Sequence, residues 1–105
     1  MDPYDDLVVK PAPQLTRNEG QNITLSCEAS LGVFKGAPVW TKDKKTLKIE
    51  QGRMNVKNWT DQKSISELHI QNAMSEDAGL YECNAVKDID GRNYQKATRL
   101  TIKSK

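Results

Sequence analysis

The chain has 105 residues and carries 16 Lys and Arg against 14 Asp and Glu, a net charge of +2. This length suits one domain and is too short for two, so we expect residues 1–105 to form a single domain. The charge balance is far from the basic excess of nucleic-acid-binding domains. Hydrophobic residues make up 36% of the chain and never form a run long enough to be a transmembrane helix. Composition therefore argues against a nucleic-acid partner and against membrane insertion by this segment.

The N-terminal stretch MDPYDDLVVK is acidic and poor in apolar residues. It does not resemble a secretory signal peptide, which has an apolar centre. We expect Met1 to be an expression start on a segment excised from a larger parent protein, with residues 1–5 flexible. If that parent is secreted or membrane-bound, its signal and its anchor lie outside this chain.

Alternating apolar and polar residues, the pattern of a half-buried strand, recur along the chain, whereas helical spacing does not. The alternation predicts strands within residues 21–30, 64–70, 79–86 and 97–103. The residues that it turns inward are Ile23, Leu25, Cys27 and Ala29, then Ser66, Leu68 and Ile70, then Tyr81, Cys83 and Ala85, and finally Thr98, Leu100 and Ile102.

Turn residues separate these runs. Asp90-Gly91 predicts a tight hairpin between the last two strands. Pro3, Pro11 and Pro13 place the N-terminal segment at a sheet edge, because proline cannot donate to a strand ladder. About eight short strands with turns between them predict an all-β, two-sheet antiparallel sandwich.

The two cysteines, Cys27 and Cys83, lie far apart in the sequence. A catalytic thiol needs a histidine partner and a zinc site needs four ligands, but His69 is the chain's one histidine. A single disulfide closing a long loop is the simplest interpretation, worth about 4 kcal/mol in the chain-entropy description. Two buried, reduced thiols in a cytosolic protein are the alternative.

Two N-x-Thr sequons are present, at Asn22 and at Asn58. Such sequons are acceptors for N-linked glycans in secreted proteins. Together with the cysteine pair they favour an extracellular protein. We expect Asn22 on an outward strand face, where a glycan would mask that sheet. A glycan at Asn58 would exclude a protein interface around the neighbouring Trp59.

Cys27, Trp40 and the run SEDAGLYEC (75–83) resemble the I-set of the immunoglobulin superfamily over nearly the whole chain. The resemblance implies an immunoglobulin-like sandwich with one inter-sheet disulfide, shielded by a tryptophan and flanked by a tyrosine corner. It also implies an ion pair across the bottom of the sandwich and clearance at Gly79. The residues to which it gives a structural role are Trp40, Leu68, Tyr81, Arg53 and Asp77.

A narrower resemblance comes from NEGQNITLSCEAS, SELHIQN, EDAGLYECNA and RLTIKSK, which are similar to the membrane-proximal domain of the basigin, neuroplastin and embigin group. It implies an adhesion role in a single-pass glycoprotein, and escort of monocarboxylate transporters to the plasma membrane. Residues 31–38 and the 87–96 hairpin do not contribute to this match.

A protein partner, heterophilic or homophilic, is the expected ligand, because immunoglobulin modules bind partners through loops and one sheet face. Isolated exposed apolar residues are common, so the alternative is an ordinary surface. The candidate partner surface consists of Val39, Leu80, Ile89, Arg92 and Tyr94.

Lysines crowd the middle of the chain and could bind a polyanion such as heparan sulphate. Lysines also protect exposed strand edges from pairing, which is the alternative. The candidate patch consists of Lys42, Lys44, Lys45 and Lys48.

Catalysis finds little support in the sequence. His69 is predicted to point outward, and the glycines form no phosphate-binding run. Asp88 and Asp90 fall short of the six oxygen ligands of a calcium site. We therefore expect no enzyme activity, no metal and no cofactor.

Three functions follow from these patterns. The first is an extracellular recognition or adhesion module of a cell-surface glycoprotein, on the outer side of the plasma membrane or, as a second choice, secreted. The second is a structural link in an intracellular muscle giant, in which I-set modules also occur. The third is a heparan-sulphate-binding domain of a secreted or receptor protein.

Overall fold

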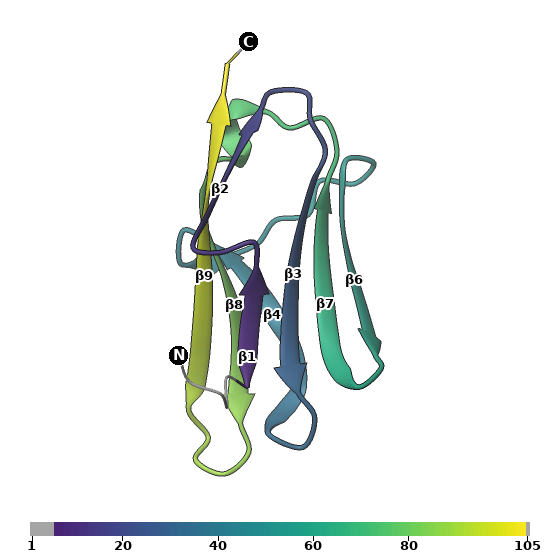
Figure 1. Cartoon of the computed structure of the whole chain (residues 1–105), viewed down its shortest axis with the longest axis vertical. Coiled ribbons are helices and arrows are strands. Elements are labelled where there is room, and N and C mark those ends of the chain that lie inside the picture. Colours follow the sequence, from purple (N-terminus) through teal and green to yellow (C-terminus); the bar gives the residue numbers. More distant parts are fainter. Residues whose placement is uncertain (1–5, 105) are drawn as a thin grey trace.

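The computed structural model describes residues 6–104, which form two sheets packed face to face (Figure 1). One sheet has four strands in the order β1-β3-β7-β6, and the other has five in the order β2-β9-β8-β4-β5. The elements are β1 (Leu7–Lys10), β2 (Gln14–Asn18), β3 (Ile23–Ser30), β4 (Phe34–Lys42), β5 (Lys45–Thr46), β6 (Met54–Thr60), β7 (Lys63–Ile70), a 3₁₀ helix η1 (Ser75–Asp77), β8 (Gly79–Lys87) and β9 (Asn93–Lys103). The predicted all-β sandwich is confirmed, and the expectation for residues 1–5 falls outside the described part of the chain.

One strand pair departs from the predicted antiparallel arrangement. β2 runs parallel to β9, with Leu15 opposite Leu100, so the five-stranded sheet is mixed. The N-terminal segment supplies an edge strand to each sheet: β1 pairs with β3, and β2 pairs with β9. Pro11 and Pro13 lie where the chain changes sheets. Proline interrupts a ladder, so the segment is split in two instead of forming one strand.

The core follows the predicted alternation. The inward residues of β3, β7, β8 and β9 are buried between the sheets, apart from the half-buried Ile102. Cys27 on β3 and Cys83 on β8 form the disulfide that joins the two sheets. Trp40 is buried on β4 opposite Cys83, and its Nε1 donates to Ser66 Oγ at 3.1 Å. A buried indole N–H needs such a partner, so Ser66 on β7 fixes the ring in the core.

The stretch from η1 to the start of β8 joins the two sheets at one end. Arg53 Nη1 lies 2.7 Å from Asp77 Oδ2, which is the ion pair that the resemblance implies. The Tyr81 hydroxyl donates to the Asp77 carbonyl at 2.6 Å. A Cβ added to Gly79 would lie 2.8 Å from Asp43 Oδ2, so a larger residue here would displace the Asp43 carboxylate. These contacts show that Arg53, Asp77, Gly79 and Tyr81 stabilise the fold. A binding surface is therefore sought elsewhere on the domain.

The last hairpin is wider than the Asp90-Gly91 motif predicts. β8 ends at Lys87 and β9 begins at Asn93, so residues 88–92 form the loop. The Gly91 N–H donates to the Lys87 carbonyl, and Gly91 takes a φ of 67°. The predicted hairpin at Asp90-Gly91 is thus present with a longer loop, within which Asp90 Oδ1 accepts the Arg92 N–H at 2.9 Å.

The two ends of the described chain lie at opposite poles of the long axis, which measures 46 Å (Figure 1). At one pole the Asp6 carbonyl accepts the Ser30 N–H at 2.8 Å, near the 88–92 loop. At the other pole the Lys103 carbonyl accepts the Glu19 N–H at 2.8 Å. The chain therefore enters and leaves the sandwich from opposite ends.

Candidate interaction surfaces

The structure does not bring the five predicted partner residues onto one surface. Val39 is 61% exposed on the outer face of the five-stranded sheet. Leu80 lies on the same outer face but is half-buried at the start of β8. Ile89, which is 91% exposed, lies with Arg92 in the loop beyond the other end of β8. The length of the strand, roughly 3.4 Å per residue, keeps the two ends apart.

Tyr94 is also placed differently from the prediction. It pairs with the buried Ala85, so its ring turns to the inner side of the sheet. The ring meets Phe34 edge-on with centroids 6.5 Å apart, and its hydroxyl donates to Asp90 Oδ2 at 2.9 Å. Lys87 Nζ lies 4.4 Å from the ring centroid. Tyr94 therefore braces the last hairpin and does not form a patch with the residues of the outer face.

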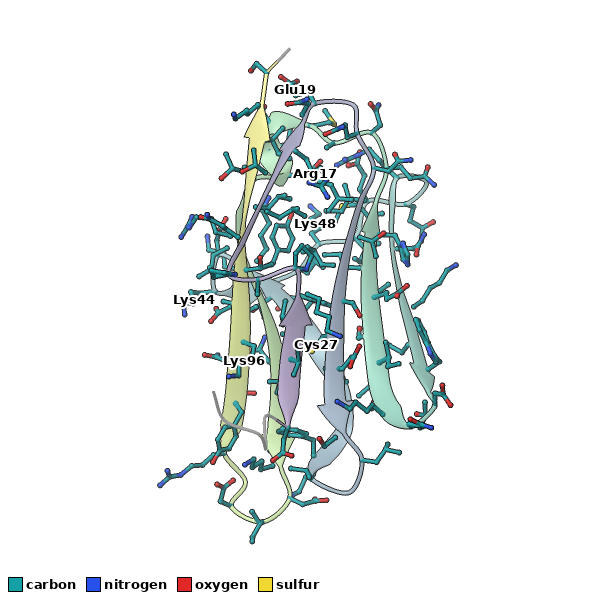
Figure 2. The ribbon with its side chains drawn as sticks, in the orientation of Figure 1. Arg17, Glu19, Cys27, Lys44, Lys48 and Lys96 are labelled. Atoms are coloured by element: carbon teal, nitrogen blue, oxygen red, sulfur yellow. A yellow bond between two sulfur atoms is a disulfide. The ribbon has the colours of Figure 1, made fainter. Side chains whose placement is uncertain are left out.

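The predicted polyanion patch does not form one group of free ammonium groups. Lys42 Nζ donates to the Glu76 carbonyl and lies 5.8 Å from the centre of the Tyr81 ring. Figure 2 shows Lys44 and Lys48 at separate places on the molecule. Lys42 and Lys45 are cross-strand partners of β4 and β5, whereas Lys44 lies in the turn between these strands. The four residues concerned are Lys42, Lys44, Lys45 and Lys48.

Lys44 instead covers a buried carboxylate that the sequence analysis missed. Glu82 points to the outer face of β8, as its alternation predicts, yet it is only 5% exposed. Its Oε1 and Oε2 lie 3.1 Å and 3.2 Å from Lys44 Nζ. Glu82 lies between Thr41 and Ala97 of the neighbouring strands. A central strand position hides a side chain from solvent even on the outer face, and alternation alone does not reveal this.

A cleft of about 570 Å³ opens on the side of the sandwich between β5 and β6; we call it the flank cleft. Residues 47–53 cross here from one sheet to the other without strand or helix. Leu47, Ile49 and Met54 give the flank cleft apolar walls, and the exposed Lys45 and Lys48 also line it. Lys42 lines it as well, so three of the four predicted polyanion-binding lysines share one concave surface.

Arg53 and Asp77 form an ion pair that lines the flank cleft, and the pKa values of both groups are shifted. Burial alone would raise the pKa of Asp77, but hydrogen bonds from Arg53 and from the Met74 N–H, with the charge of Arg53, hold it below its usual range. Hydrogen bonds to Asp77 and Glu50 raise the pKa of the Arg53 guanidinium. Burial, followed by the charge of Asp77, raises the pKa of the Tyr81 hydroxyl. Each charged group of the floor is thus compensated by its neighbours.

A smaller hollow of about 220 Å³ lies beside the flank cleft; we call it the flank hollow. Leu47 and Ile49 line both spaces, so residues 47–49 separate the two. The other residues that line the flank hollow are Pro38, Val39, Trp40, Thr46, Val56 and Asn58. This side of the sandwich was not predicted from the sequence, although the alternation of Leu47 and Ile49 was a signal for it.

Both sequon asparagines are exposed. Asn58 lies on the edge strand β6 and lines the flank hollow. Asn22 does not lie on a strand face as expected, because β3 begins one residue later. Its Oδ1 accepts the Asn72 N–H at 3.1 Å, which ties it to the turn after β7. A glycan on Asn22 would leave from the end of the sandwich and would not mask a sheet.

His69 has a hydroxyl and a carboxylate beside it on the outer face of the four-stranded sheet. Its Nδ1 lies 3.3 Å from Thr24 Oγ1, and its Nε2 lies 3.0 Å from Glu67 Oε1. This order matches that of a catalytic triad, but none of the three lines the flank cleft or the flank hollow. A triad also needs oxyanion donors and a concave substrate site. The cluster is better described as a hydrogen bond between β3 and β7 and a contact between neighbouring outward residues of β7.

Within residues 6–104, no three His, Cys, Asp or Glu side chains gather as metal ligands would. In the same part of the chain, no helix is long and apolar enough to cross a membrane.

Comparison with known proteins identifies several relatives of the chain. It is 39% identical over 71 residues to the striated muscle preferentially expressed protein kinase of Danio rerio, covering 68% of this chain and 2% of that protein. It is 41% identical over 64 residues to the fibroblast growth factor receptor homolog 2 of Drosophila melanogaster, covering 61% of this chain and 5% of that protein. The chain thus spans a few per cent of the length of these relatives, and their activities are not transferred to it.

Solved structures share the fold. Titin domain M7 superposes with a TM-score of 0.66 at 22% identity, covering 92% of this chain and 93% of that one. Titin domain M3 gives a TM-score of 0.67 at 19% identity, covering 92% and 96%. The family model of the immunoglobulin domain matches residues 6–86. The chain belongs to the immunoglobulin domain family.

Proposed function

We propose that this immunoglobulin domain is an extracellular recognition module of a cell-surface or secreted glycoprotein, and that it binds a protein partner. The observation that carries the proposal is the inter-sheet disulfide together with two exposed sequon asparagines, Asn22 and Asn58. Disulfides persist in oxidising compartments, and N-linked glycans are added in the secretory pathway. A receptor among the relatives, the fibroblast growth factor receptor homolog, is in keeping with this role.

The test uses protein from its native source. Thiols are alkylated without reduction, and intact mass and glycopeptide mass are then measured. We expect Cys27 and Cys83 to resist alkylation, and at least one of Asn22 and Asn58 to carry a glycan. Two alkylated cysteines and two bare asparagines would contradict the proposal.

A structural link in an intracellular muscle giant is the second candidate. The observation that favours it is the position of the chain ends at opposite poles, which suits an end-to-end array. A titin homolog of Caenorhabditis elegans, 30% identical over 94 residues, is among the relatives. Reduced thiols and location in the sarcomere would favour this candidate over the first.

The two finer roles that the sequence suggested remain proposals with tests of their own. Escort of a monocarboxylate transporter would appear as co-purification of the transporter with the full-length parent from detergent extracts. Heparan sulphate binding would now rest on Lys45 and Lys48, which line the flank cleft together with Lys42, whose Nζ donates to the Glu76 carbonyl. Salt-resistant retention on heparin, lost in a Lys45→Glu/Lys48→Glu variant and kept in Lys35→Glu, would support it. Elution of the unmodified domain at low salt would remove it.

A further inference from the structure

We propose that the first N-acetylglucosamine attached to Asn58 packs into the flank hollow and covers the open side of the sandwich. The inference rests on the proposed extracellular function, because it needs the glycan to be added. The occupant of the flank hollow would then be a sugar that is covalently attached to this chain. Two independent observations meet at Asn58: it is the acceptor of a sequon, and it lines the hollow.

The direction of the Asn58 side chain follows from the register of β6. Asn58 pairs with Ser66, which is fully buried on the inward face of β7. Alternation puts Met54, Val56 and Asn58 on this same inward face. Met54 is buried, Val56 is half-buried and Asn58 is exposed. A glycan on Asn58 therefore starts from between the sheets, not from the outer face.

Asn58 is exposed because little of the opposite sheet extends over it. The edge strand of that sheet, β5, has two residues, and the chain then leaves the sheet along residues 47–53. The outer face of β6 carries Trp59 instead, which alternation turns away from the hollow. The open side between β5 and β6 is thus where the acceptor nitrogen and the unfilled space coincide.

The chemistry of the flank hollow suits a single sugar. Its walls include Ile49, which is 40% exposed, and the half-buried Leu47 and Val56. A pyranose ring presents C–H groups on its faces, and the acetamido methyl adds a further apolar group. Covering these side chains removes apolar surface from water. The volume of about 220 Å³ is below the usual 300–1,000 Å³ of small-molecule pockets, and so favours one ring over a larger ligand.

The experiment compares single-site variants made in a secretory host that adds high-mannose glycans. Thr60→Ser keeps the Asn58 sequon, and Thr60→Ala removes it. Enzymatic trimming leaves one N-acetylglucosamine on each occupied site. We expect the trimmed Thr60→Ser protein to melt about 4 °C above the Thr60→Ala protein. We also expect nuclear Overhauser contacts between the acetamido methyl and the methyl groups of Leu47 and Val56.

A substitution in the wall of the flank hollow tests whether the sugar stabilises the domain by packing against that wall or by a general effect of glycosylation. Ile49→Ser should reduce the gain in melting temperature that the Asn58 sugar gives. Ile89→Ser, in the 88–92 loop outside the lining of the flank hollow and 91% exposed, is the matched control and should leave that gain unchanged. An occupied Asn58 with no gain and no methyl contacts would overturn the inference and leave the extracellular function standing. Bare Asn22 and Asn58 with reduced cysteines in native protein would overturn both.

Discussion

The guanidinium of Arg53 donates hydrogen bonds to both carboxylate oxygens of Asp77, from Nη1 to Oδ2 at 2.7 Å and from Nη2 to Oδ1 at 2.9 Å. The Asp77 side chain is 5% exposed and also accepts the Met74 N–H. The pair ties the residue before β6 to η1, which leads into β8 of the other sheet. A buried, two-point pair of this kind couples the two sheets because neither charge can be left without its partner.

We expect Asp77→Ala to lower the free energy of unfolding by about 3 kcal/mol, because the change removes both hydrogen bonds from Arg53 and the acceptor of the Met74 N–H, and leaves Arg53 with the exposed Glu50 alone. Glu50→Ala is the control, since Glu50 is mostly exposed although it also pairs with Arg53. Exposed pairs are worth at most about 1 kcal/mol. Urea denaturation followed by circular dichroism measures both. Equal losses in the two variants would contradict the importance of the buried pair.

The same pair predicts how stability depends on pH. The pKa of Asp77 in the folded protein lies below its usual value, which is about 3.9 in the unfolded chain. The carboxylate therefore contributes stability that is present above about pH 4 and is lost as the pH falls through the folded pKa. We expect Asp77→Asn to weaken this acid dependence between pH 5 and pH 2. Urea titrations across that range test it, and parallel curves for the two proteins would rule it out.

The close contact between Gly79 and Asp43 predicts that a larger residue at position 79 is destabilising. A Cβ at residue 79 would collide with the Asp43 carboxylate, whose Oδ1 accepts the Leu80 N–H at 2.9 Å. We expect Gly79→Ala to lower the free energy of unfolding by about 1–2 kcal/mol. Asp43→Gly removes the obstacle and tolerates the φ of 51° at that position. In the Asp43→Gly background the cost of Gly79→Ala should therefore shrink; an unchanged cost in this double-mutant cycle would refute the clash.

The fold could be predicted from the sequence because local alternation and a few special residues agree. The inward sets of β3, β7, β8 and β9 follow from period-2 spacing. The parallel pairing of β2 with β9 could not be read in this way, because Gln14–Asn18 has one half-buried apolar residue, Leu15. An edge strand with so little apolar patterning does not reveal which sheet it joins.

The candidate surfaces were harder to predict than the fold. Alternation correctly placed Val39 and Leu80 on the outer face of the sheet. It could not predict how much of each side chain is exposed, because this depends on the neighbouring strands. Charge clustering in the sequence also failed to show that Lys42 and Lys44 are engaged by Glu76 and Glu82. Closeness in the sequence does not show which way each lysine near a tight turn points, nor which residue of a neighbouring strand or helix it contacts.

The disulfide makes the last prediction, and it bears on both candidate functions. Cys27 and Cys83 lie 56 positions apart, and cross-linking a loop of this length is worth about 4 kcal/mol in the chain-entropy description. Small domains have a total stability of about 5–15 kcal/mol, so its loss leaves little reserve. We expect Cys27→Ala/Cys83→Ala to unfold at much lower urea than the oxidised domain, and reduction of the unmodified protein to reproduce most of the loss. A domain that stays equally stable when reduced would not need an oxidising compartment, and the intracellular link would then become the better candidate.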